Sequence, residues 1–378
     1  MPFARSAATA GRALVCTVLI TGCGAIRIAP APVEIVENNA DTATAAPRGR
    51  RFYTGKTVGS EAAFNPVSVL VNESFDLLRT AAANRRVFEL PYEVAARGAW
   101  RAMTQPDRVL RTYGYDTWVR RQLLPLTGKQ KGGGQWVPNY QLHLLGGGMT
   151  GVRMTEWYDQ HGVAHPELAA AGTAAVWHFM NEMIEHQSGI PTADALSDLL
   201  VFDPAAFLLW RTDRVQRVFS TRLEMTNWPG QPTFTMPTQT LQNMHQTVML
   251  RGKLWRDYRP MTTFGGSFLL GVSRRRGATD WISVAGGWDP TEHPIVDPVT
   301  GEKTVTLNPN IGLFYDRDGS LLAGLHLRLN RAELLTMNVY PGVVYFGRWS
   351  PGLFAHVLDD GRVRFGIVPR FGLGLGVE

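Results

Sequence analysis

The chain contains little cysteine, little lysine and few charged residues of any kind. Two cysteines among 378 residues cannot form a disulfide framework. Charged residues account for 19% of the sequence, against roughly 25% in ordinary soluble proteins, and only five of the 38 basic residues are lysines. Hydrophobic residues still reach 44%, which excludes disorder for most of the chain. The net charge of +6 leaves nucleic acid and an anionic membrane surface as candidate partners.

The first two dozen residues have the layout of a secretory signal. Arg5 and Arg12 form a positively charged segment, and residues 13–20 form a short apolar run. A run of this length is well below the about 20 residues of a transmembrane helix, so it predicts a signal peptide. The segment that follows, Leu19-Ile20-Thr21-Gly22-Cys23, resembles the lipobox of bacterial lipoproteins.

The lipobox resemblance implies that residues 1–22 are removed and that the thiol of Cys23 carries a diacylglycerol. Cys16 would be lost with the signal peptide, so the mature chain would hold no internal disulfide. Multiple acyl chains anchor a protein far better than one chain does. Because Gly24 rather than aspartate follows the cysteine, the resemblance favours the outer membrane. Residues 23–58 predict a flexible tether, since they are rich in proline, alanine and threonine.

Residues 59–215 predict a helical region. Asn65-Pro66 and Asp203-Pro204 each combine an N-cap residue with proline at the first helical position. His165-Pro166 begins the longest expected helix, which runs to about residue 187 and is almost entirely apolar in its first part. Residues 140–158 fit no single element type.

Residues 216–378 change to a period of two, which is typical of strands. Apolar and polar residues alternate in the segments 305–313, 321–329, 335–345 and 362–377, and 217–225 is one of several weaker strands. Asp-Gly sequences at 318–319 and 360–361 predict short hairpin turns. The predicted fold class is therefore α+β, a helical region followed by an antiparallel β-meander or barrel of about 8–10 strands.

Two environments are compatible with such a meander. A soluble barrel packs its apolar face inside, whereas a membrane barrel turns that face to lipid and its polar face inward. From Thr304 onward there is no lysine, and the acidic residues are expected at turns or chain ends, Asp316 and Glu333 among them. This pattern favours a membrane-type sheet. The final residue, Glu378, departs from the terminal aromatic residue that is typical of outer-membrane barrels.

One segment groups residues that could carry chemistry. On a helix, His178, Glu182 and Glu185 share one face, which makes them candidate catalytic residues, and His178, Glu182 and His186 are candidate metal ligands. The alternative is the solvated end of a buried helix. Five further residues are candidate partners of this segment: His143, His161, His165, Asp198 and Asp203, of which Asp203 is better explained as an N-cap.

These observations predict a lipid-anchored protein of the outer membrane, of structural or binding type, which binds or organises lipid or cell-surface material. One alternative is an enzyme acting on envelope lipid or glycan through His178, Glu182 and Glu185; another is a tethered carrier of a hydrophobic ligand. The expected partners are membrane lipids, through acylated Cys23 and the sheet surface. Nucleic acid is disfavoured, because the arginines are scattered and the signal exports the chain. We predict no cofactor, and a metal ion has no support beyond this one segment.

The lipobox prediction is tested by replacing each cysteine in turn. In a bacterial host fed a labelled fatty acid, Cys23→Ser should abolish incorporation of label, because no thiol remains to be acylated. The matched Cys16→Ser variant should incorporate label as the unaltered chain does. Label retained in Cys23→Ser would contradict the prediction.

Overall fold

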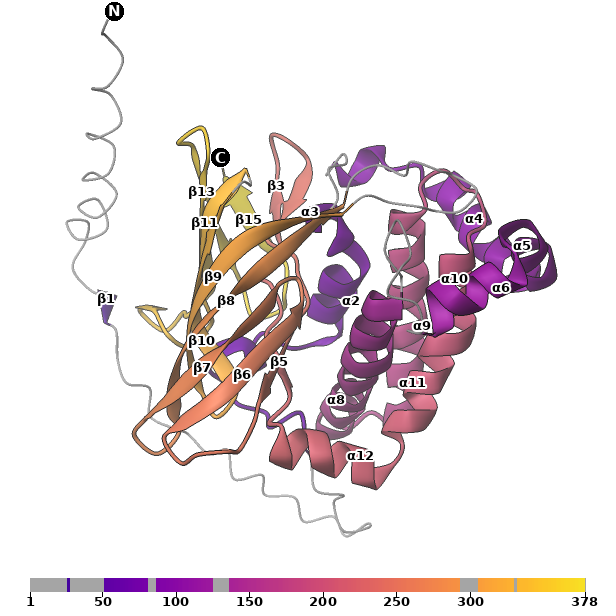
Figure 1. Cartoon of the computed structure of the whole chain (residues 1–378). Helices are drawn as coiled ribbons and strands as arrows, with labels where there is room; N and C mark the ends of the chain where they lie inside the picture. The colour runs from indigo at the N-terminus through magenta and orange to yellow at the C-terminus, as the bar shows by residue number, and fades with distance from the viewer. Residues whose placement is uncertain are drawn as a thin grey trace, which may run out of the picture.

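The computed structural model describes residues 26–27, 51–80, 86–124, 136–292, 305–329 and 332–377. The predicted signal peptide and Cys23 lie outside the described residues. Helices occupy the first half of the described chain and a large, mostly antiparallel sheet the second half, so the α+β class is confirmed. Figure 1 shows the sheet on one side of the molecule, helices α8, α9 and α11 on the other, and α2 between them.

The helical region consists of short helices around one long central helix, α9. Its elements are η1 (Gly59–Glu61), α2 (Pro66–Phe75), α3 (Leu77–Thr80), η2 (Val87–Glu89), α4 (Tyr92–Thr104), α5 (Pro106–Tyr113), α6 (Tyr115–Trp118), η3 (Val119–Leu123), α7 (Trp136–Pro138), η4 (Asn139–Gly147), α8 (Gly148–Gln160), α9 (Pro166–Glu185), α10 (Ala193–Ser197), η5 (Asp198–Phe202), α11 (Asp203–Trp210), α12 (Asp213–Arg217) and η6 (Val218–Arg222).

Two of the three predicted proline starts are confirmed. The side chain of Asn65 accepts a hydrogen bond from the Ser68 amide, with Pro66 opening α2, and His165 precedes Pro166 at the start of α9. The N-cap interpretation of Asp203 is wrong. Asp203 has helical dihedral angles, φ −65° and ψ −47°, because η5 continues without a break into α11. Its carboxylate is therefore not needed for capping.

The sheet contains 13 strands within the described ranges. They are β2 (Thr226–Asn227), β3 (Thr233–Thr235), β4 (Thr240–Gln242), β5 (Thr247–Arg251), β6 (Tyr258–Gly265), β7 (Phe268–Arg276), β8 (Asp280–Glu292), β9 (Val305–Arg317), β10 (Ser320–Arg328), β11 (Glu333–Val339), β13 (Gly352–Leu358), β14 (Val363–Val368) and β15 (Gly374–Val377). Neighbours from β5 to β15 are consecutive and antiparallel, as expected for a meander, apart from the two-residue β12 (Tyr345–Phe346).

Three local expectations about the strands were wrong. Residues 217–225 are mostly helical, since Arg217 pairs with Asp213 one turn earlier in α12. The expected last strand is two strands, β14 and β15, interrupted at Gly372, whose φ of +99° favours glycine. Asp316 is not a turn residue: it lies inside β9 and points inward.

The two ends of the sheet belong to one hairpin. The strand order runs from β2 to β4 and leaves the sheet open between them. However, the register that sets Asn227 opposite Val248 continues through amide-to-carbonyl bonds from Trp228 to Thr247 and from Gly230 to His245, both 2.7 Å. The same register then sets Thr233 opposite Gln242 in the pair β3–β4. The end strands are thus adjacent parts of a single long hairpin.

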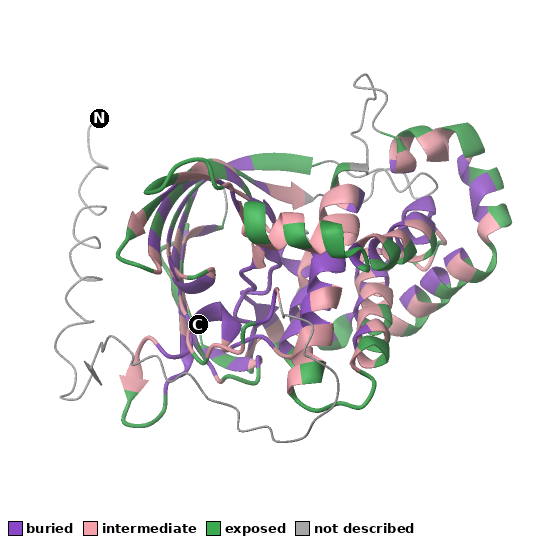
Figure 2. Ribbon diagram, turned by 90° about the horizontal axis from the view of Figure 1, so that it is seen from below, coloured by how far each residue is buried: buried purple, intermediate pink, exposed green. Residues whose placement is uncertain are grey.

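The sheet is inverted relative to a water-soluble sheet. In β9 every exposed side chain from 305 to 313 is apolar or threonine, whereas Asn308, Asn310 and Asp316 are buried. We call the exposed set the apolar belt: Phe268, Leu270, Val272, Ile282, Val284, Trp288, Val305, Leu307, Ile311, Leu313, Leu327, Leu329, Met337, Val363, Phe365, Ile367, Leu375 and Val377. In Figure 2 the sheet curves around buried segments on its inner side, with the helices beyond them.

Buried ion pairs hold the inner face together. Asp289 of β8 is fully buried. Its Oδ2 atom lies 2.5 Å from Arg328 Nε of β10 and 3.4 Å from Arg79 Nη1 of α3. Burial opposes ionisation of Asp289, but the two guanidinium groups outweigh it and hold its pKa well below the usual range. Deeper in the sheet, Arg251 pairs with Asp316. Arg79 therefore ties the helical region to the polar inner face.

An apolar cluster fills the remaining space on the inner face, among Trp228, Met249, Leu269, Phe314 and Tyr340. Further clusters join the sheet to the helices, for example Phe52, Trp210 and Phe264. Throughout the described part of the chain, no helix combines the length and apolar character that crossing a bilayer requires.

Removal of the Asp289 charge should destabilise the whole fold. Asp289→Asn leaves two buried arginines without their common partner, which should lower the free energy of unfolding by about 3–5 kcal/mol. The matched control is Asp360→Asn, because Asp360 pairs with the exposed Arg362. The free energy of unfolding of this variant should be unchanged. Denaturation followed by circular dichroism measures both. Equal stability of the two variants would contradict the role of Asp289.

Candidate functional site

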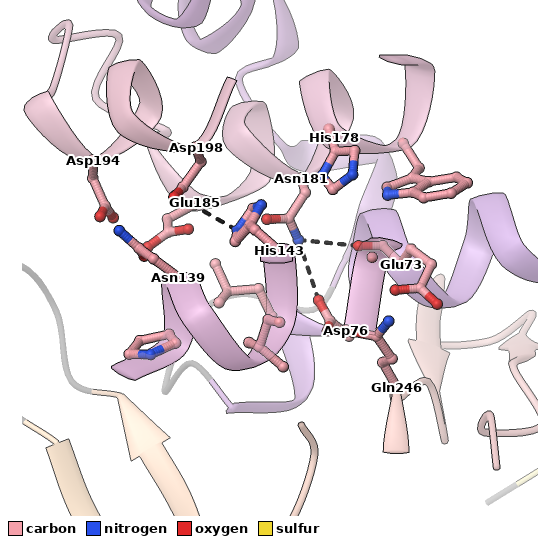
Figure 3. A pocket seen from close by; sticks show the side chains of 15 residues that line it. Glu73, Asp76, Asn139, His143, His178, Asn181, Glu185, Asp194, Asp198 and Gln246 are labelled. Carbon is pink, nitrogen blue, oxygen red and sulfur yellow. Dashed lines mark hydrogen bonds and ion pairs between the residues drawn. The ribbon is translucent and has the colours of Figure 1, made fainter. Parts of the chain in front are cut away.

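A cavity of about 90 Å³ lies in the middle of the helical region, against one strand of the sheet. Its walls come mainly from five helices, α2, η4, α9, α10 and η5. On the side of the sheet it is lined by Gln246, which directly precedes β5. The polar lining side chains, shown in Figure 3, are Glu73, Asp76, Asn139, His143, His178, Asn181, Glu185, Asp194, Asp198 and Gln246. The volume accommodates several water molecules.

Two histidines share one carboxylate beside this cavity. His143 Nδ1 lies 2.9 Å from Asp203 Oδ1, and His178 Nδ1 lies 3.3 Å from the same oxygen. The two imidazole rings stack with centroids 5.3 Å apart. The other ring nitrogen of His143, Nε2, lies 3.6 Å from Asp198 Oδ2. His143 is thus placed between two aspartates from η5 and α11.

Glu182 lies one turn after His178 on α9 and is completely buried. Neither of its carboxylate oxygens has a hydrogen-bond donor, although His186 Nδ1 lies 3.3 Å from Oε2. Glu182, His143 and Asp198 each present a ligand atom within 4.8 Å of the others. A second such group joins Glu182 to Glu185 and His186, and a third joins His143, His178 and Asp203.

The electrostatics of the site follow from an excess of buried carboxylates. Burial raises the pKa of Asp198 well above its usual value, and Asp194, Glu182 and Asp203 add to the increase against the opposing effect of His143. Burial also raises the pKa of Glu73, with a further contribution from Asp76.

The two stacked histidines differ in their charge preference. For His143 burial lowers the pKa, but Asp198 and Asp203 outweigh it and the net pKa is raised. His178 has less compensation, so burial lowers its pKa to about 4. His178 is therefore a neutral base at pH 7, beside the acidic side chains that line the cavity.

Close helix packing brings these residues together. Asn181 of α9 donates to the Glu73 carbonyl oxygen and to Asp76 Oδ1, which fixes α2 against α9 (Figure 3). On the opposite side, Trp210 of α11 donates its indole hydrogen to the Leu144 carbonyl oxygen at 2.8 Å. This approach needs Gly148, because a Cβ there would lie 2.1 Å from Trp210 Cδ1.

The structure separates the predicted residues into three groups. His178 and Glu185 line the cavity, and Glu182 lies behind its wall. His143, Asp198 and Asp203 join them, as candidate partners were expected to do. The predicted metal trio is not brought together as a set, because His186 turns its Nε2 to Thr192 Oγ1 at 3.0 Å, away from His178.

His161 and His165 do not contribute to the cavity. His161 is exposed and stacks on Trp157 with centroids 3.8 Å apart, and His165 is exposed at the start of α9. The sequence analysis missed Glu73 of α2, Asp76 directly after it, and Asp194 of α10. Their spacing showed no pattern of catalytic or metal-binding residues, and only tertiary packing brings their carboxylates to α9.

Comparison of the chain with protein-family models, with curated proteins and with solved structures yields no match. The arrangement offers a neutral imidazole as a general base, buried carboxylates with raised pKa values, and a set of nitrogen and oxygen atoms suited to a divalent cation.

Two glycines of the same helix provide a test of the packing that builds the site. Gly148→Ala forces the Trp210 ring to move and should destabilise the protein by about 1–3 kcal/mol. Gly151→Ala meets nothing within 4 Å and should stabilise the helix by about 0.5–1 kcal/mol. Thermal unfolding of both variants measures the difference. The same sign of change in both would contradict close packing at Gly148.

Proposed function

We propose that this protein is a lipid-anchored component of the bacterial outer membrane that places the apolar belt of its sheet against acyl chains. It binds or organises lipid or cell-surface material from there. The observation that carries the proposal is the inversion of the sheet: apolar side chains cover the outer face, and charged and amide side chains lie on the inner face beside an apolar cluster. Water on the outer face would leave this large apolar area without a favourable contact.

The belt is continuous across neighbouring strands. Val284 of β8 lies opposite Leu313 of β9, and Ile311 of β9 lies opposite Leu327 of β10. Farther along the sheet, Phe365 of β14 lies opposite Val377 of β15. Side chains on registered positions of adjacent strands touch, so the belt forms one surface from β7 to β11 and a second part on β14 and β15. Between these parts, β13 directs the half-buried Leu353, Ala355 and Val357 to the same side.

The length of the belt suits a membrane-spanning strand. Along β9 the exposed positions form a band from 305 to 313, which is nine residues. A tilted strand needs about 9–11 residues to cross the hydrocarbon layer. Below this band, Asp280 and Arg317 form an ion pair of 2.8 Å where β8 and β9 meet their turns. This charged pair lies at the end of the two strands.

Sheet edges in lipid must not leave backbone groups without partners. Here the two end strands are parts of one hairpin, and Asn227, Thr233, Thr235 and Gln242 in them are buried. The open strand order therefore exposes no long edge to the surroundings of the belt. This arrangement supports a membrane position for the sheet.

Exposed aromatic residues lie beside the first described residues of the chain. Ile26, three positions after Cys23 in the sequence, pairs with Phe346 in the two-stranded sheet of β1 (Ile26–Arg27) and β12. Phe346 and Trp349 are both exposed. Exposed aromatic side chains suit the interface between membrane and water.

The carrier alternative receives less support from this geometry. A cavity on the inner face, lined by Trp228, His245 and His326 among others, has a volume of about 10 Å³. This space holds at most a single water molecule and not a hydrophobic ligand. The enzyme alternative is favoured by one observation, the neutral His178 beside the carboxylates of the larger cavity.

An arginine placed in the belt distinguishes lipid from water as its environment. Ile311→Arg should lower the stability of the protein in phospholipid bilayers by about 2–4 kcal/mol, because a guanidinium is costly among acyl chains. The control is Met236→Arg, in the turn between β3 and β4, where the side chain is exposed but outside the belt; little change is expected.

The same pair of variants can contradict the proposal. If the sheet were in water, Ile311→Arg would be neutral or would increase solubility. Unchanged stability of Ile311→Arg in bilayers, together with a Cys23→Ser protein that stays monomeric without detergent, would refute a membrane position for the belt.

A further inference from the structure

We propose that the helical region binds one divalent cation, Zn²⁺ or Mn²⁺, through His143 Nε2, Glu182 and Asp198, with Asp203 as the residue that orients His143. This inference is independent of the membrane position of the sheet. The three ligands come from η4, α9 and η5, so the ion would join three helices that meet only in the folded protein.

The distances suit a small cation. The three ligand atoms lie within 4.8 Å of one another, and His143 Nε2 is 3.6 Å from Asp198 Oδ2. Two ligands held about 2.1 Å from a tetrahedral zinc ion are roughly 3.4 Å apart. Small rotamer adjustments therefore bring all three atoms into coordination. Nitrogen and carboxylate donors without a thiol suit Zn²⁺ and Mn²⁺.

Glu182 provides a second, independent indication of a ligand. Its side chain is completely buried, and both of its oxygens have no hydrogen-bond donor. A buried carboxylate without donors is costly unless an ion compensates it. The nearby His186 meets part of this need, at 3.3 Å from Oε2, but Oε1 has no comparable contact. A cation between Glu182, His143 and Asp198 supplies the missing partner.

The Asp203–His143 pair has the arrangement that orients metal-binding histidines. Asp203 Oδ1 lies 2.9 Å from His143 Nδ1 and accepts its hydrogen. A cation bound at Nε2, which faces Asp198, takes the place of the second ring proton of His143. Carboxylates that bind the second ring nitrogen in this way fix the tautomer and make the imidazole a better ligand.

The charge of the surroundings favours the same location. The carboxylates of Glu182, Asp198 and Asp203 lie around the imidazole of His143. Buried carboxylates need a positive partner, and a divalent cation provides one for several of them at once. The cavity adjoins His143 and Asp198, so water can complete the coordination.

The two competing groups are less suitable. In the first, His143 and His178 both direct Nδ1 to one oxygen of Asp203, which is better explained by hydrogen bonding. In the second, His186 is engaged by Thr192. We therefore assign the ion to His143, Glu182 and Asp198.

Metal content and affinity test the assignment on the full-length, tag-free protein in detergent. After treatment with a chelator, titration with Zn²⁺ or Mn²⁺ should show one ion per chain. Asp198→Asn should weaken binding at least about 100-fold. Asp203→Asn should weaken it about 10–100-fold, because His143 loses its orientation but the ligands remain. The control His165→Asn, at the exposed histidine just before α9, should bind as the unaltered protein does.

X-ray absorption of the zinc-loaded, unaltered protein supplies a measurement that does not depend on variants that fold poorly. The expected spectrum has one imidazole and carboxylate or water oxygens at about 2.0–2.1 Å. Two imidazoles would move the ion to the His143–His178 pair and overturn the proposal. Absence of stoichiometric binding of either cation, or full affinity in Asp198→Asn, would also overturn it.

Discussion

The fold depends on the neutralisation of polar groups on the inner face of the sheet. Asp289, fully buried, is tolerated only because Arg328 of the same sheet and Arg79 of the helical region flank it. A charged side chain that is removed from water on the inner face is stable only if an oppositely charged group lies beside it. The sheet consequently needs the helices that supply Arg79, and the helices in turn acquire a fixed position relative to the sheet. With its polar residues directed inward, the sheet presents apolar residues outward.

Hydrogen bonds between buried polar groups also fix the helices of the helical region relative to one another. Asn181 joins α9 to α2, Trp210 joins α11 to η4, and Asp203 receives both stacked histidines. Glu182 departs from this pattern most clearly, because neither of its buried oxygens has a hydrogen-bond donor and only His186 Nδ1 lies close to one of them. A residue that breaks the rule of buried polar satisfaction is where function is expected. The membrane proposal thus rests on the exposed apolar belt, and the metal proposal rests on the buried Glu182, whose carboxylate lacks hydrogen-bond donors.

Much of the fold could be predicted from the alternation of residues. The period of two in 305–313 and the proline start at Pro66 depend on local physics, and the structure confirms both. The hairpin that joins the sheet ends could not be predicted, because its residues 226–251 alternate poorly and contain irregular turns. In the site, the spacing of His178, Glu182 and Glu185 on one helix could be predicted. The role of Asp203 could not, since Asp-Pro is equally typical of a helix start, and only packing against η4 reveals its contact with His143.

The contact between the apolar belt and acyl chains is the central claim, and site-directed spin labelling tests it most directly. The mature chain is expected to hold no free thiol, so a single new cysteine can be labelled without interference. In bilayers, a label at Val284→Cys in the belt should collide frequently with oxygen and rarely with a water-soluble nickel reagent. A label at Asp318→Cys, in the turn after β9, should show the opposite preference. Equal exposure of both labels to the nickel reagent would contradict the account.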